Sequence, residues 1–192
     1  EGVMKTDARV RYTRMVLRES LLHFMRDKAI TEISVKEVCE RAQLNRSTFY
    51  KHYKDCYDLL EQIENEMLQE YLNSMEQVSC VNVRDLIGSI LDMMDKNRDL
   101  CELLAAGRLG DGLIRKMMEI AYEEGTAYWR TLLADTEEDR IEMLFTCLAG
   151  GLLNLILYGY GKYSREQLID FADTLVQSCF APYIGGGNIN KP

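Results

Sequence analysis

The chain has 192 residues, enough for one domain or for a small domain fused to a larger one, and its two prolines stand at positions 182 and 192. Because proline is the residue that helix interiors tolerate least, this composition predicts an all-α fold. The net charge of −8 argues against a nucleic-acid partner for the chain as a whole. However, residues 1–60 hold 12 Lys/Arg and 9 Asp/Glu, which gives +3, while residues 61–192 carry −11. A basic head on an acidic body suits a protein that touches phosphates at one end, although chance explains the charge difference equally well on its own.

The first 60 residues predict four helices in quick succession. An apolar face formed by Leu17, Leu21, Phe24 and Met25 predicts a helix over about 9–28, and the basic residues before it indicate no signal peptide. A capping box, a Ser followed by a Glu three residues later, begins a second helix at Ser34. The chain then turns at residues 43–44, a third helix capped by Asn45 runs over 46–52, and Asp55 caps the fourth, whose inner stripe is Leu59, Ile63 and Met67.

The stretch 34–54 has the spacing of a helix-turn-helix unit. Its second helix is too polar for a core element, while Phe49 and Tyr53 lie four apart on its other side. A helix with one anchored side and several hydrogen-bond donors fits the major groove of DNA. The alternative is an ordinary surface helix, but spacing, capping and local basicity together favour a DNA reader.

The string from Ile33 to Asp55, ISVKEVCERAQLNRSTFYKHYKD, resembles the TetR/AcrR family of bacterial transcription regulators. Within it, TFYKHY at 48–53 is similar to the recognition-helix signature of that family, and the resemblance covers about residues 10–70. Three positions depart from the pattern. Ala29 and Gln43 stand where the family often has Gly. Cys56 stands where the family usually has a Lys that contacts phosphate, and Lys54 is a candidate to replace that contact.

The resemblance implies an N-terminal helix-turn-helix domain, 1–55, and a larger helical domain, 56–184, that dimerises and often binds a small effector. The resemblance implies that residues 45–48 face bases or nearby phosphates and that residues 50–52 contact the DNA backbone and base edges. It also implies that Lys36 reaches a phosphate. With Lys54 from the residue pattern, the candidate DNA contacts are Lys36, Asn45, Arg46, Ser47, Thr48, Tyr50, Lys51, His52 and Lys54.

Longer amphipathic helices are predicted in the second half, near 83–96, 99–107, 111–134, 136–161 and 164–182, the last begun by a capping box at Ser164. The Gly-rich tail, 185–192, is predicted to be disordered. Two stripes with spacings of 4 and 3 predict a four-helix dimer interface: Ile141, Phe145, Leu148, Leu152 and Leu155, then Leu168, Ala172, Leu175 and Cys179. The alternative is that both stripes pack inside one chain.

Residues 143–161 form an uncharged segment that is long enough to span a membrane. Four glycines, Thr146 and Asn154 dilute the segment, and we expect a helix buried between protein partners rather than in a membrane. Methionines and aromatics predict an apolar effector pocket, with plain core as the alternative: Met93, Met94, Met117, Met118, Tyr122, Tyr128 and Trp129.

The six cysteines, at 39, 56, 80, 101, 147 and 179, form no C-x-x-C pair and are accompanied by two His. We interpret them as reduced core residues of a cytoplasmic protein, with no metal site and no cofactor. A redox-sensing thiol at Cys56 is an alternative to a core role. The sequence shows no catalytic grouping, so we do not expect an enzyme. From the helix-turn-helix resemblance we expect a homodimeric repressor that binds a near-palindromic operator on double-stranded DNA and is released by a small effector. A non-catalytic regulator controlled by a protein partner is the alternative.

Overall fold

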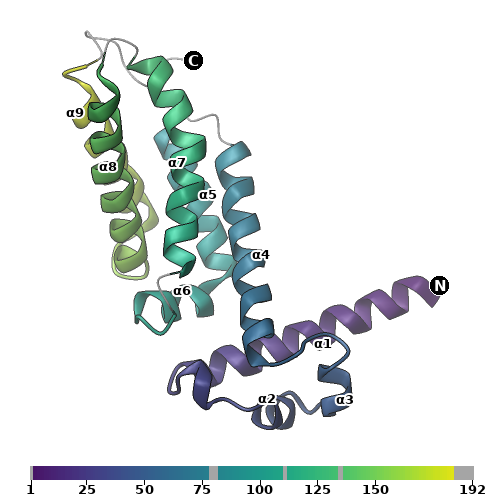
Figure 1. Cartoon of the computed structure of the whole chain (residues 1–192). Helices are drawn as coiled ribbons and strands as arrows, with labels where there is room; N and C mark the ends of the chain where they lie inside the picture. The colour runs from purple at the N-terminus through teal and green to yellow at the C-terminus, as the bar shows by residue number, and fades with distance from the viewer. Residues whose placement is uncertain (1, 78–81, 110–111, 134–135, 184–192) are drawn as a thin grey trace. The chain divides into compact units, whose positions relative to one another are not determined.

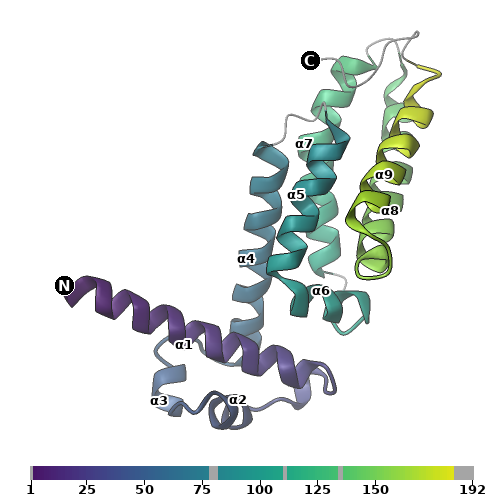
Figure 2. The same ribbon diagram turned by 180° about the vertical axis from the view of Figure 1, so that it is seen from behind.

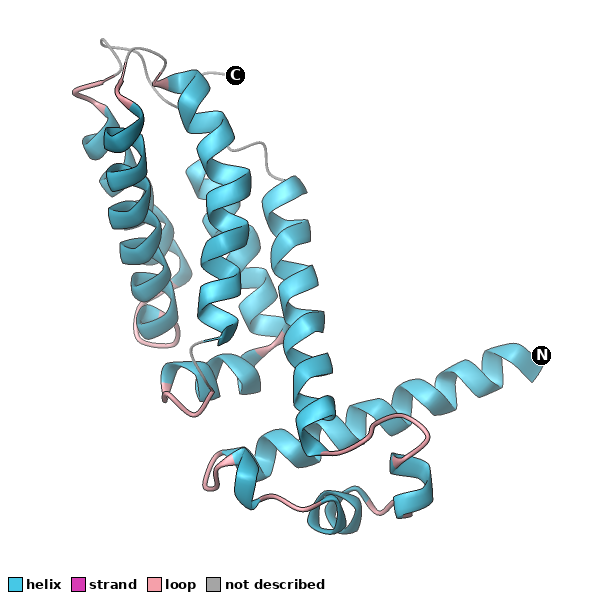
Figure 3. Cartoon of the chain, in the orientation of Figure 1, coloured by secondary structure: helices cyan, strands magenta, loops and turns pink. Residues whose placement is uncertain are grey.

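The computed structural model describes residues 2–77, 82–109, 112–133 and 136–183, and within these ranges the chain is helical and contains no strand (Figure 3). The predicted tail at 185–192 lies outside the described residues. The chain divides into two compact units. The first unit comprises residues 1–66 and 102–109, and the second unit comprises residues 67–101 and 110–192.

The first unit is built on α1 (Gly2–Met25), α2 (Val35–Ala42), α3 (Arg46–Phe49) and the beginning of α4 (Cys56–Gln77), with a 3-10 turn at Ile30–Glu32. Its core contains the apolar positions that the sequence predicted on α1 and α4, together with side chains from α2 and α3, all nearly inaccessible to water: Leu17, Leu21, Met25, Val38, Phe49, Leu59 and Ile63. Helix α1 begins earlier than predicted, at Gly2 rather than near Arg9. Helices as short as α2 and α3 are not stable alone, so they depend on packing against this core.

The second unit contains the rest of α4 and the helices α5 (Val83–Lys96), α7 (Gly112–Leu132), α8 (Glu138–Gly159) and α9 (Arg165–Phe180), while α6 (Arg98–Ala105) is shared with the first unit. Helix α5 packs against α9, and α8 packs against both α7 and α9 (Figures 1 and 2). Ion pairs connect α5 with α9, from Arg165 to Asp92 at 2.8 Å and from Arg84 to Asp170 at 2.6 Å and Asp173 at 3.6 Å.

The predicted boundaries of these longer helices agree with the observed ones to within two residues at every end. The segment predicted over 83–96 has those bounds, and the capping box at Ser164 is present, with its Oγ accepting a hydrogen bond from the Gln167 N–H. Local signals that lie next to a helix end therefore located that end well.

Three cysteines are buried as predicted: Cys39, Cys56 and Cys101. Cys147 is free but exposed on α8, and Cys80 lies outside the described residues. In the part of the chain that the structure describes, no group of three or more His, Cys, Asp or Glu is placed to hold a metal ion. Among the described helices, α8 is the one whose length and composition would allow a membrane crossing, and 28% of its most apolar stretch is buried.

Candidate nucleic-acid interface

The helix-turn-helix begins with the predicted capping box. The Glu37 N–H donates to Ser34 Oγ at 3.3 Å, and the Ser34 N–H donates to Glu37 Oε2 at 2.9 Å. Lys28, which the sequence reasoning did not single out, donates from Nζ to Glu37 Oε1 at 2.7 Å. The hydrogen bonds from Lys28 and Ser34 lower the pKa of Glu37 from 4.5 to about 2. The start of α2 is therefore tied to the loop that follows α1.

The turn between α2 and α3 depends on Gln43, which adopts the left-handed conformation with φ 54°. The Gln43 N–H donates to the Glu40 carbonyl at 3.3 Å, and the Leu44 N–H donates to the Cys39 carbonyl at 2.9 Å, so α2 closes with two backbone bonds. Asn45 occupies the N-cap position of α3, as predicted, but its side chain makes no capping hydrogen bond. The exposed Asn45 amide is therefore available to a partner.

Helix α3 is anchored on one side and exposed on the other. Phe49 is fully buried and Tyr53 is 4% exposed. Regular helix ends at Phe49, earlier than the predicted His52, yet the His52 and Tyr53 N–H groups both donate to the Phe49 carbonyl at 2.9 Å. The Arg14 Nε of α1 donates to the Tyr53 hydroxyl at 3.3 Å, which raises the pKa of Arg14. The inner side of α3 is thus fixed to α1.

The candidate DNA contacts are gathered on α2, on α3 and in the loop after α3, within the first unit (Figure 1). Seven of the nine side chains are exposed: Lys36, Asn45, Arg46, Ser47, Tyr50, Lys51 and Lys54. Thr48 and His52 are half-buried. Lys36 Nζ lies 3.7 Å from Glu40 Oε1 in an exposed i,i+4 pair, from which a phosphate can displace the Glu40 carboxylate at little cost.

The beginning of α4 is capped by two bonds between backbone N–H groups and carboxylates. The Asp58 N–H donates to Asp55 Oδ1 at 2.9 Å, as the capping role predicted for Asp55 requires. Asp58 accepts from the Lys54 N–H at 2.7 Å, and this bond is the main cause of the lowered pKa of Asp58. The role of Asp58 was missed, although Asp-x-x-Asp is a variant of the capping-box pattern. The backbone of Lys54 is thereby held at the edge of the candidate interface.

Cys56 is not suited to redox sensing. The thiol is 3% exposed, and burial raises its pKa from 9.0 to about 11. The reactive form of cysteine is the thiolate, which burial in apolar surroundings disfavours. The core role that the sequence favoured for Cys56 is therefore confirmed.

No protein-family model matches the sequence. A solved TetR transcriptional regulator from Streptococcus agalactiae is similar over 91% of this chain and 98% of its own, with a TM-score of 0.62 and 19% identity. The dihydroxyacetone kinase operon activator DhaS is similar over 89% and 96%, with a TM-score of 0.58 and 14% identity. The chain has the TetR fold.

A curated relative, an uncharacterized HTH-type transcriptional regulator named YxbF from Bacillus subtilis, is 31% identical over 51 residues. That match covers 27% of this chain and 13% of the relative's length. The all-α TetR architecture expected from the sequence is confirmed over nearly the whole chain.

In this TetR-like chain, the predicted dimer stripes face largely inward. Ile141, Phe145, Leu148, Leu168 and Ala172 are buried inside the chain itself, and Leu152, Leu155, Leu175 and Cys179 are half-buried. Leu152, Leu175 and Cys179 pack on a core cluster that includes Leu148, Val176 and Phe180. The water-exposed apolar groups of α8 and α9 are different ones: Met143, Cys147, Tyr158 and Phe171. The exposed apolar side chains of α8 and α9 therefore lie beside the predicted stripe.

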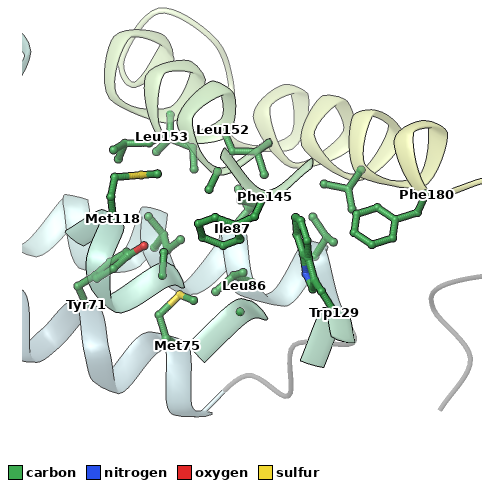
Figure 4. A pocket seen from close by; sticks show the side chains of 17 residues that line it. Tyr71, Met75, Leu86, Ile87, Met118, Trp129, Phe145, Leu152, Leu153 and Phe180 are labelled. Carbon is green, nitrogen blue, oxygen red and sulfur yellow. The ribbon is translucent and has the colours of Figure 1, made fainter. Parts of the chain in front are cut away.

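The TetR-like body also holds an apolar cavity of about 120 Å³ within the second unit (Figure 4). Of the predicted pocket residues, Met118 and Trp129 line it, whereas Met93, Met94 and Met117 are buried in the core elsewhere. Tyr122 lies outside the cavity lining and donates to Glu142 Oε1 at 3.1 Å. The side chain of Tyr128 lies outside the described residues.

Proposed function

We propose that this chain is a sequence-specific DNA-binding regulator of transcription that acts as a homodimer on a near-palindromic site. The observation that carries the proposal is the arrangement of α3. Its Phe49 is fully buried while Arg46, Ser47 and Lys51 are exposed together on the outer side. A short helix fixed by its inner side can enter the major groove without losing its support, and its donors then meet base edges and phosphates.

The charge distribution supports the same partner. The basic residues of 1–60 outnumber the acidic ones, and several acidic groups in this segment are occupied by caps or ion pairs rather than free to repel phosphate. Glu37 accepts from Lys28 and Ser34, and Asp58 accepts from the Lys54 N–H. The interface therefore presents mainly donors to DNA, which carries a dense row of negative charges.

The homodimer is supported by the exposed apolar surface of α8 and α9, which lie side by side. We call this surface the α8–α9 face: Met143, Cys147, Gly150, Gly151, Tyr158 and Phe171. A Cβ added at Gly150 or Gly151 would meet no atom within 4 Å, so these two positions open directly to the surface. A second copy seated on this face would cover Met143, Tyr158 and Phe171, each more than half exposed in the single chain.

We further infer a cytoplasmic regulator, non-enzymatic, whose DNA affinity is changed by a small effector in the cavity of the second unit. A repressor released by that effector is the form expected from the sequence. Because DhaS is named an operon activator, activation is the alternative sign of regulation. Control by a protein partner is the alternative to a small effector, and the cavity favours the small molecule.

The experiment is selection of bound duplexes from a random DNA library with the full chain. We expect recovery of a near-palindrome, and binding to it should weaken steeply as salt rises because phosphate contacts release counterions. The double variant Arg46→Ala/Lys51→Ala should enrich no sequence. The matched control, Arg115→Ala/Lys116→Ala, removes two exposed cations from α7 and should recover the same site.

Two results would contradict the proposal. One is enrichment of the same sequence by the α3 double variant. The other is an affinity for the selected duplex that does not change between low and moderate salt.

A further inference from the structure

The cavity of the second unit is almost free of polar groups. Its walls come from α4, α5, α7, α8 and α9 and consist of aliphatic, methionine and aromatic side chains, with no charged residue among them. Figure 4 shows Trp129 and Phe145 on one side and Met118 on another. Trp129 stacks edge-on against Phe145 and Phe180, with ring centroids 5.4 Å and 4.7 Å away. A charged ligand would lose its hydration here without gaining an oppositely charged partner.

Among the lining residues, the Tyr71 hydroxyl and the Trp129 indole N–H are the hydrogen-bonding side-chain groups. The Tyr71 side chain is 6% exposed, and Figure 4 shows its hydroxyl directed among the other lining side chains. Within the described residues the Tyr71 hydroxyl makes no hydrogen bond, although buried hydroxyls nearly always have a partner. Burial raises the pKa of Tyr71 to about 12, so the group is a neutral donor at physiological pH.

The size of the cavity sets the size of the occupant. An engineered apolar cavity of about 150 Å³ in another protein binds benzene. A volume of about 120 Å³, bordered by the adaptable side chains of Met75 and Met118, suits one ring or a short branched chain. Larger multi-ring molecules would require the helices to separate.

We propose that the cavity binds a small uncharged molecule, about the size of a single aromatic ring, whose one oxygen accepts or donates a hydrogen bond at the Tyr71 hydroxyl. The binding itself does not depend on the chain being a DNA regulator. Its consequence for DNA affinity rests on the proposed function.

Three probes of one ring each test this class: phenol, toluene and benzoate. Trp129 is the only tryptophan of the chain and lines the cavity, so its fluorescence reports occupancy directly. We expect saturable binding of phenol and toluene with a rise in melting temperature. Benzoate should bind at least about tenfold more weakly than phenol, because its carboxylate is ionised.

The variant Tyr71→Phe removes the hydroxyl and keeps the ring. It should weaken phenol binding about fivefold to tenfold, the size of one hydrogen bond, and leave toluene binding unchanged. Tyr122→Phe is the matched control, because the Tyr122 hydroxyl bonds Glu142 outside the cavity lining, and it should change neither affinity. Ala121→Leu adds three carbons to a lining residue and should weaken both neutral probes more than about tenfold, with helical content by circular dichroism checked alongside.

The proposal is overturned if no neutral probe changes Trp129 fluorescence saturably, if benzoate binds as well as phenol, or if Tyr71→Phe weakens toluene and phenol equally. A separate measurement tests the regulatory role. If phenol binds the cavity but leaves the affinity for the selected duplex unchanged, the effector role fails and the ligand class of the cavity stands.

Discussion

Helices α3 and α8 present opposite chemistries to their surroundings. Helix α3 has four residues, of which Phe49 is buried and the others carry polar groups. Helix α8 has 22 residues, with one apolar stripe packed inside the chain and a second apolar stripe exposed. A polar surface with donors suits a phosphate-bearing partner, whereas an exposed apolar stripe suits another protein surface. The contrast underlies the proposal that α3 recognises DNA and that α8 mediates self-association.

The largest effect is expected from removing the anchor of α3. Phe49→Ala should lower the free energy of unfolding of the first unit by about 3–5 kcal/mol, because it leaves a cavity in a closed core. Urea unfolding followed by circular dichroism measures this loss. The exposed Tyr12 of α1 supplies the control, since Tyr12→Ala should change the stability by less than about 0.5 kcal/mol. Equal losses in the two variants would show that α3 is not held by Phe49.

A charge on the α8–α9 face should separate the two chains of the proposed dimer. Gly151→Glu places a carboxylate where the single chain has open space, so the monomer should keep its fold. In a dimer the charge would be buried without a partner, at a cost of about 3 kcal/mol or more, which weakens association at least about 100-fold.

Light scattering measures the loss of the dimer in Gly151→Glu, and a DNA-binding assay should show that operator binding is lost with it. Gly112→Glu is the matched control, because it adds the same charge at an open helical glycine on α7. A Gly151→Glu protein that stays dimeric would place the interface elsewhere. Leu152 is unsuitable for this test because it lines the cavity.

Single substitutions on the outer side of α3 should have intermediate effects. Arg46→Ala should cost about 1–3 kcal/mol of binding and relax the sequence preference at one position of the site, as expected for a base contact. Lys36→Ala should weaken binding to all sequences evenly and reduce the salt dependence by about one counterion. Binding curves on the selected duplex and on single-base variants separate these patterns. The assignment to α3 fails if Arg46→Ala weakens all duplexes evenly.

Acid should loosen the start of α2 through Glu37. The folded pKa of Glu37 lies near 2, below its ordinary value of 4.5. The stabilisation is therefore complete above about pH 4.5 and disappears as the pH falls towards 2. Urea midpoints measured between pH 6 and pH 2.5 should fall less steeply in Glu37→Gln than in the unmodified chain. Glu123→Gln, on an exposed residue of α7, is the control and should leave the slope unchanged.

The smallest effect is expected at the turn between α2 and α3. Gln43→Gly removes the side chain from a residue in the left-handed conformation and so relieves backbone strain in the folded state. Glycine also makes the unfolded chain more favourable through its entropy, but we expect the relief of strain to exceed this effect, for a net stabilisation of about 0.5 kcal/mol. Thermal unfolding should show a slightly raised melting temperature. Gln43→Ala keeps the strain and should show no such gain.

The first unit was largely predictable because its signals are local. The caps at Ser34 and Asp55 and the anchor Phe49 can be identified from residues a few positions apart, and the structure confirms them. The TetR fold followed from the same stretch. Arg14 was missed because its partners Tyr53 and Glu66 lie 39 and 52 residues away, and no local pattern points to them.

The second unit was predicted less fully, for a physical reason. Residues 143–161 are uncharged on all sides, so hydrophobic periodicity alone cannot choose which stripe of α8 packs inward. The stripe at Phe145 and Leu148 forms core, and the side of α8 that stays exposed is set by α7 and α9. Met118 and Trp129 line the cavity, but helical spacing could not exclude Met93 from its wall.

The left-handed Gln43 has a further consequence for the energetics of DNA binding. A glutamine in this turn has fewer backbone conformations open to it than a glycine would have, so the angle between α2 and α3 is restricted before any DNA is present. Less configurational freedom is then lost when α3 enters a groove, and the association is less opposed by entropy. The strain that slightly lowers the stability of the free protein therefore makes its reader more rigid. In the proposed complex, this one turn would therefore lower the folding stability slightly and raise the affinity for the operator.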